Sequence, residues 1–132
     1  SAGMGKVFGL GRAARDAAIG RVQEGVMAGE AIRGFEVDDA ARGVIDQAGF
    51  GEFFVHRTGH SIGQDVHGNG ANMDNLETHD ERHVTPWTCF SIEPGIYLPG
   101  EFGIRSELDV YLAEDKALVF GLPLQTEIVS IF

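Results

Sequence analysis

The stretch IRSELDVYL at residues 104–112 alternates between apolar or small side chains and charged or polar ones. Successive side chains of a β-strand point to opposite faces, so this pattern predicts a single strand with one apolar face. The other face carries Arg105, Glu107 and Asp109, which are either solvated or line an acidic pocket. The apolar side chains that we expect to pack against helices are Ile104, Leu108 and Val110.

Two amphipathic helices are predicted before this strand. Residues 10–27 carry apolar side chains at a spacing of four, with charged residues on the opposite face. Residues 36–48 repeat that arrangement over a shorter length. Gly29 and Gly49 follow the two segments at positions where a left-handed backbone conformation commonly ends a helix.

Further short strands are predicted on both sides of residues 104–112. The segment TCFSIEPGIYL indicates a strand that is broken at Pro94-Gly95. Two helices followed by an antiparallel sheet predict an α+β fold. The predicted strands are residues 53–55, 88–98, 104–112, 117–120 and 125–131.

The length and the absence of a linker predict one domain over residues 1–132. Within it, residues 1–9 are interpreted as a possible remnant of an expression tag followed by a lead-in, because Ser1-Ala2-Gly3 precedes Met4.

The composition excludes several classes of protein. A net charge of -10 repels phosphate backbones, so nucleic-acid binding is not expected. The sequence has no apolar tract long enough to span a bilayer, so no membrane association is expected. The lone Cys89 lies in an apolar run and is interpreted as a core residue. No signal peptide is visible, which favours a cytoplasmic location.

Four motifs that could carry chemistry follow one another: HRTGHSIG, DVHG, SIEPGIY and GIRSELDV. A single histidine is more often structural than catalytic, so each motif alone is a weak indication. Taken together, His60, Glu93 and Glu107 form a partial ligand set, because carboxylates and imidazole suit divalent ions such as Mn²⁺ and Zn²⁺. We expect these three side chains to converge on one point.

The order of these motifs resembles the pita-bread metallopeptidases, and most of all their Xaa-Pro aminopeptidase and dipeptidase branch, which includes prolidase. The segments FFVHRTGHSIG, VHGNGANMDNLETHDER, FSIEPGIY and GIRSELDV followed by PLQTEI carry the likeness. It implies that the chain is the carboxy-terminal part of a pita-bread (creatinase/aminopeptidase) catalytic domain.

The resemblance also implies roles for individual residues. His60 is expected to be a metal ligand, Glu93 a ligand and proton shuttle, and Glu107 a ligand that bridges two ions. Among the neighbouring side chains, His56 and His67 are expected to face the substrate. Arg105 is expected to support the ligating carboxylates.

The chain departs from the family pattern in one respect. The resemblance places two aspartate ligands on strands before the first helix, and residues 1–9 hold neither. Three of the five expected ligands are therefore present, which should bind no ion or a single weakly held one. We expect this chain to be inactive alone, although the full-length enzyme would use Mn, Co, Zn or Fe. The absent strands would leave a sheet edge exposed, which favours self-association.

The resulting hypothesis is a peptidase that removes amino-terminal residues from peptides with proline at the second position, using a dinuclear metal centre. Two alternatives are a non-catalytic protein-interaction module and a creatinase-like amidinohydrolase. Retention of His60, Glu93 and Glu107 argues against the interaction module, which has no physical need of them.

Overall fold

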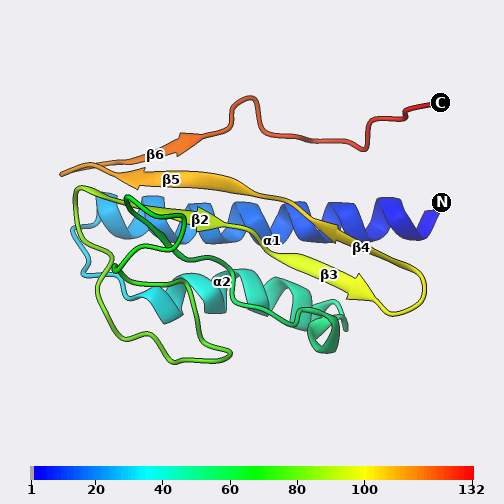
Figure 1. Cartoon of the computed structure of the whole chain (residues 1–132), viewed down its shortest axis with the longest axis horizontal. Coiled ribbons are helices and arrows are strands. Elements are labelled where there is room, and N and C mark those ends of the chain that lie inside the picture. Colours follow the sequence, from blue (N-terminus) through cyan, green and yellow to red (C-terminus); the bar gives the residue numbers. More distant parts are fainter. Residues whose placement is uncertain (1) are drawn as a thin grey trace.

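The computed structural model describes residues 2–132, and Ser1 of the predicted tag remnant lies outside the described residues. Helices α1 (Ala2–Met27) and α2 (Gly34–Gln47) pack on each other, and the strands run along α1 (Figure 1). Helix α1 contacts strands of both sheets, whereas α2 packs on α1 and on the short helix η1 (Gly51–Phe53). The predicted α+β arrangement of two helices on an antiparallel sheet is confirmed.

The strands form two antiparallel groups. A four-stranded sheet has the order β1-β2-β5-β6, and β3 pairs only with β4. Side chains of α1 and of the sheet share one apolar core, in which Val22, Phe90 and Val110 are each at most 1% exposed. The strands are β1 (Ser61–Ile62), β2 (Thr88–Ile92), β3 (Gly95–Leu98), β4 (Phe102–Arg105), β5 (Leu108–Leu112) and β6 (Ala117–Phe120).

Helix α1 is longer than predicted and begins at Ala2, so residues 2–9 are helical. Val7 explains the difference, because its buried side chain continues the apolar stripe of α1 into the shared core. The predicted ends of both helices are confirmed by the positive φ angles of Gly29 (69°) and Gly49 (83°).

The prediction of a single strand over residues 104–112 is wrong, because the segment is divided between β4 and β5 at Ser106-Glu107. This break faces the predicted one between β2 and β3, and the Ser106 N–H donates a 3.3 Å hydrogen bond to the Pro94 carbonyl. The predicted apolar face is confirmed, since Leu108 and Val110 are buried in the core and the partly buried Ile104 packs against it.

Two other predicted strands are absent from the described chain. Residues 53–55 follow the end of α2 in a tight turn, where Phe54 N–H bonds Gly51 O as part of η1. Residues 125–131 form no strand. Their backbone is held instead by α1, since Arg15 donates to the Gln125 carbonyl and Arg12 to the Thr126 carbonyl.

None of the helices in residues 2–132 combines the length and the apolar character that crossing a bilayer requires.

Candidate metal centre

All the predicted site residues lie around one open hollow with a volume of about 350 Å³. The hollow lies beside the two facing chain breaks, one between β2 and β3 and the other between β4 and β5. Arg57 lines it as well, although no sequence pattern indicated a role for that residue. The lining residues are His56, Arg57, His60, His67, Glu93, Arg105 and Glu107.

His60 and Glu93 are in direct contact, with 3.2 Å between Nε2 of the imidazole and Oε1 of the carboxylate. The other ring nitrogen, Nδ1, lies 3.0 Å from the Ser61 carbonyl, which can only accept, so Nδ1 carries the proton. Ser91 ties the pair together, because its hydroxyl donates to Glu93 Oε1 and accepts from the His60 backbone N–H.

Glu107 also lines the hollow, and Arg105 links it to Glu93. The Arg105 guanidinium lies 3.7 Å from Oε2 of Glu93 and 3.7 Å from Oε2 of Glu107, so it connects the two carboxylates. Within residues 2–132 no three metal-ligating side chains are close enough together to hold an ion. The predicted convergence of three side chains on one point therefore holds only for His60 and Glu93, and it is wrong for Glu107, which lines the same hollow but contacts Arg105 instead of the other two ligands.

The two other histidines that line the hollow have different neighbours. His67 lies against His60, with ring centroids 4.4 Å apart. His56 donates from Nδ1 to the Arg57 carbonyl, and its Nε2 accepts a 2.7 Å hydrogen bond from the Tyr97 hydroxyl. The ring of Tyr97 lies over Gly95 and Gly103, where an added Cβ would collide with it. Sequence reasoning missed this tyrosine, although it stands inside the SIEPGIY motif.

A buried ion pair on α2 holds the segment that carries His56 and His60. Asp38 is fully buried and accepts bonds from Arg42 and from both the N–H and the hydroxyl of Thr58. Arg42 also donates to the carbonyls of Phe54 and His56. The opposite charges of Asp38 and Arg42, four residues apart on one helix, could have indicated this pair from the sequence.

A second buried carboxylate, Asp80, organises the long loop between β1 and β2. It accepts hydrogen bonds from the Asn72 N–H and from the backbone and guanidinium of Arg82. Burial opposes its ionisation, but the donors from Arg82 and Asn72 outweigh burial and hold the pKa of Asp80 below its usual value.

The chemistry of the His60–Glu93 pair fits two ligands of a divalent cation. With the proton of His60 on Nδ1, its Nε2 lone pair faces a carboxylate oxygen that is also an electron-pair donor. Either a proton or a cation must lie between two such atoms. A histidine that donates its other N–H to a carbonyl is the usual arrangement of a metal ligand.

Comparison with known proteins agrees with this chemistry. The sequence profile described as metallopeptidase family M24 matches residues 3–114 of the chain. The chain belongs to this family.

Individual members of the family support the assignment. The chain is 38% identical over 104 residues to the Xaa-Pro dipeptidase of Lactobacillus delbrueckii subsp. lactis, covering 79% of this chain and 26% of that protein. It is 46% identical over 83 residues to the probable dipeptidase PepE of Mycobacterium tuberculosis, covering 63% of this chain and 21% of that protein. The chain therefore spans about a quarter of the length of these M24 relatives.

Solved structures of M24 peptidases share the fold. The dipeptidase of Pyrococcus horikoshii superposes with a TM-score of 0.77 at 35% identity, covering 93% of this chain and 32% of that one. The X-Pro aminopeptidase of Thermotoga maritima gives a TM-score of 0.77 at 32% identity, covering 94% and 33%. These superpositions confirm that the chain forms part of a pita-bread fold.

Proposed function

We propose that this chain is one part of a metallopeptidase that hydrolyses the amino-terminal bond of Xaa-Pro peptides at a dinuclear metal centre. The observation that carries the proposal is the 3.2 Å approach of His60 Nε2 to Glu93 Oε1, in a hollow that Glu107 also lines. The Xaa-Pro dipeptidases and aminopeptidases among the relatives support the substrate class.

The proposed ligands are His60, Glu93 and Glu107. Divalent Mn, Co, Zn or Fe, when bound, would polarise the scissile carbonyl and lower the pKa of a coordinated water. Glu93 would accept a proton at its carboxylate and deliver it to the departing amine. Arg105 would keep the two glutamates oriented, because it contacts both of them.

His56 and His67 are proposed to bind the peptide and to stabilise the negative charge that develops on its carbonyl oxygen. Tyr97 fixes the direction of the His56 ring, since its hydroxyl donates to Nε2 while Nδ1 is held by a backbone carbonyl. Such fixed donors stabilise charge better than mobile ones, because they need no reorganisation during the reaction.

The 132-residue chain by itself is expected to bind at most one ion, and weakly. It supplies three of the five ligands that the family pattern implies, and two ions about 3.5–4 Å apart need several carboxylates to neutralise them. We therefore expect no turnover of Xaa-Pro dipeptides by this chain alone, with or without added Mn²⁺, Co²⁺ or Zn²⁺.

Calorimetric titration of the chain with Mn²⁺ and Zn²⁺ tests the site. One weak site is expected, and Glu93→Gln should lower its affinity by at least about tenfold. Asp109→Asn is the matched control, because Asp109 lies on neighbouring β5 but does not line the hollow. Equal affinities for the wild type and Glu93→Gln would refute the metal centre. Two tight sites would refute the expectation that ligands are missing.

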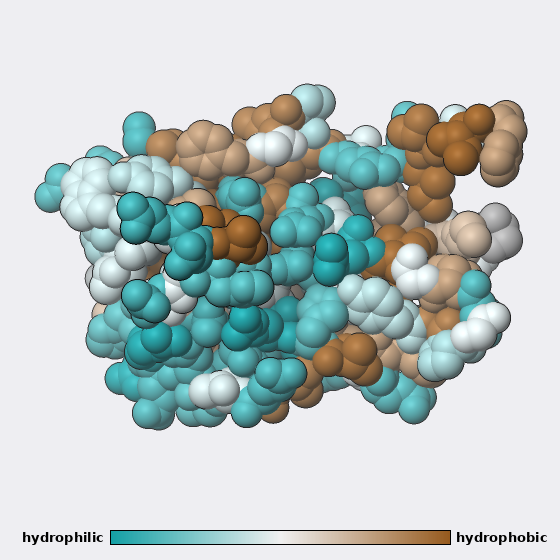
Figure 2. Space-filling model, in the orientation of Figure 1, coloured by the Kyte–Doolittle hydropathy of each residue, from teal (hydrophilic) through white to brown (hydrophobic). Residues whose placement is uncertain are grey.

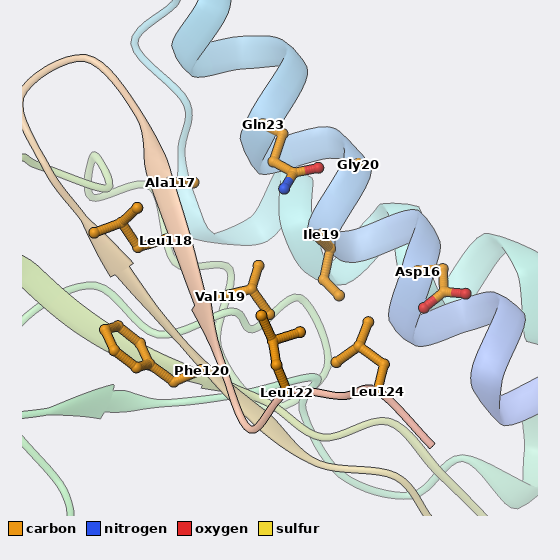
Figure 3. Close-up of a pocket in the computed structure, with 10 residues that line it drawn as sticks. All are labelled: Asp16, Ile19, Gly20, Gln23, Ala117, Leu118, Val119, Phe120, Leu122 and Leu124. Carbon is orange, nitrogen blue, oxygen red and sulfur yellow. The ribbon is translucent and has the colours of Figure 1, made fainter. Parts of the chain in front are cut away.

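The edge of the sheet supports a further proposal, that the chain self-associates there. Strand β6 is the last strand of its sheet among residues 2–132, and Leu118 and Phe120 are 37% and 53% exposed. Figure 2 shows apolar surface over β6 and the C-terminal segment. A groove of about 680 Å³ lies beside β6. In Figure 3, Ile19 of α1 faces Val119 and Leu122 across this groove.

A further inference from the structure

The two arginines that line the hollow have different electrostatic surroundings. Arg105 contacts Glu93 and Glu107, so the two carboxylates of the hollow share one guanidinium. The half-buried Arg57 forms no ion pair and no side-chain hydrogen bond with any residue in 2–132. Two carboxylates and two guanidinium groups thus line the hollow, but both carboxylates contact Arg105, and Arg57 is left without an ion-pair partner in the described chain, although the net charge of the whole chain is -10.

The backbone beneath this arginine is held on both sides. The Arg57 carbonyl accepts a 2.7 Å bond from His56 Nδ1, and the His56 carbonyl accepts a 2.8 Å bond from Arg42. On the other side, the Thr58 N–H donates to the buried carboxylate of Asp38 at 3.0 Å. The Arg57 side chain therefore extends from a backbone that is held in place, which reduces the entropy lost when its guanidinium binds a ligand.

We propose that Arg57 binds the free α-carboxylate of the peptide substrate, which makes the substrates dipeptides rather than longer peptides. A guanidinium can bind a carboxylate through two parallel hydrogen bonds, and no such partner exists inside the described chain. This inference rests on the proposed peptidase function.

The geometry of a dipeptide is consistent with this assignment. Its carboxylate lies on the residue directly after the scissile bond, and neighbouring Cα atoms are about 3.8 Å apart. When the scissile carbonyl lies near Glu93, that carboxylate therefore falls within the same hollow as Arg57. A longer peptide has an uncharged amide at that place, which would leave the guanidinium unpaired and weaken binding.

The test is an NMR titration of the ¹⁵N-labelled, metal-free chain with N-acetylproline and, separately, with N-acetylproline amide. The carboxylate should cause saturable shifts in the amides of residues 56–60, with an affinity at least about tenfold higher than that of the amide. In Arg57→Gln this preference should disappear, and in Arg57→Lys it should be reduced. Arg33→Gln is the matched control and should keep it, because Arg33 is exposed and does not line the hollow.

Several outcomes would overturn the proposal. These are equal binding of the two ligands, an unchanged preference in Arg57→Gln, or shifts that avoid residues 56–60. The result is separable from that of the metal titration, because these ligands need no metal. Equal metal affinities of the wild type and Glu93→Gln would count against the proposed metal centre, whereas absence of a carboxylate preference alone would count against the role of Arg57.

Discussion

Nε2 of His60 lies 3.2 Å from Oε1 of Glu93, and the same Oε1 accepts a 2.9 Å hydrogen bond from the Ser91 hydroxyl. The Ser91 hydroxyl donates to Glu93 and accepts from the His60 N–H, so one buried side chain sets both partners. The spacing of the imidazole and the carboxylate therefore depends on a residue that is not itself an expected ligand.

Ser91→Ala should weaken metal binding more than it weakens the fold. The substitution removes the donor that orients Glu93 and leaves the His60 N–H without its acceptor. We expect a loss of about tenfold in Zn²⁺ affinity, because groups that orient ligands typically contribute 10–100-fold. Unfolding should become easier by about 1–3 kcal/mol. Calorimetry and urea denaturation measure the two effects.

Ser61→Ala is the control for Ser91→Ala. Ser61 is also buried and its hydroxyl accepts the Gly70 N–H, but it does not touch Glu93. It should lower stability by a similar amount and leave the Zn²⁺ affinity unchanged. If both variants lose metal affinity equally, then Ser91 acts only through the fold.

Tyr97→Phe should free the His56 ring while leaving the hairpin of β3 and β4 intact. The phenyl ring can still cover Gly95 and Gly103, whereas the hydroxyl that donates to His56 Nε2 is lost. We expect changed imidazole ¹⁵N shifts for His56 and a stability loss of about 1 kcal/mol. Unchanged His56 shifts would show that the Arg57 carbonyl alone fixes the ring. As a contrast, Gly103→Ala should displace the whole Tyr97 ring, since its Cβ would collide with Cδ1.

The parts of the fold that the sequence predicted correctly are those that local patterns specify. The apolar stripes correctly predicted both helices, and Gly29 and Gly49 correctly predicted where the helices end. The breaks were harder, because alternation continues through residues 104–112 although the chain changes sheets at Ser106-Glu107. The change of sheet is explained by the hydrogen bond from the Ser106 N–H to the Pro94 carbonyl, which joins this break to the one between β2 and β3. Pro94 and Ser106 lie on different segments, so a local sequence pattern does not indicate their contact.

The candidate site divides in the same way. Motif residues such as His60 and Glu93 could be selected from the order of the motifs. The residues that orient them could not, because Ser91 and Tyr97 act through contacts with residues 31 and 41 positions away in the sequence. Arg57 was missed because an unpaired charge is visible only when all its potential partners have been placed.

Asp80→Asn should lower stability and reduce its dependence on pH in acid. The folded-state pKa of Asp80 lies below its ordinary value, so its ionised form stabilises the fold above that value. This contribution is lost as the pH falls through the lowered pKa, below about 4. We expect a loss of about 1–3 kcal/mol at neutral pH and a smaller loss in acid, measured by urea denaturation across that range. Asp115→Asn, in the exposed turn between β5 and β6, is the control. An equal loss at every pH would show that the charge of Asp80 contributes nothing.

Phe120→Lys should weaken self-association without unfolding the chain. Phe120 is 53% exposed on β6, and Figure 3 shows it on the side of the strand that faces away from α1. A lysine on an edge strand opposes pairing with another strand, because its charge would have to be desolvated at the contact. In sedimentation velocity, the average mass of the wild type should rise with protein concentration, and that of Phe120→Lys should rise much less.

Met27→Lys is the matched control, since Met27 is 85% exposed at the end of α1 and belongs neither to β6 nor to its groove. If Met27→Lys reduced association as strongly as Phe120→Lys, the added positive charge and not the sheet edge would be responsible. A wild-type chain that stays monomeric at every concentration would refute the association itself.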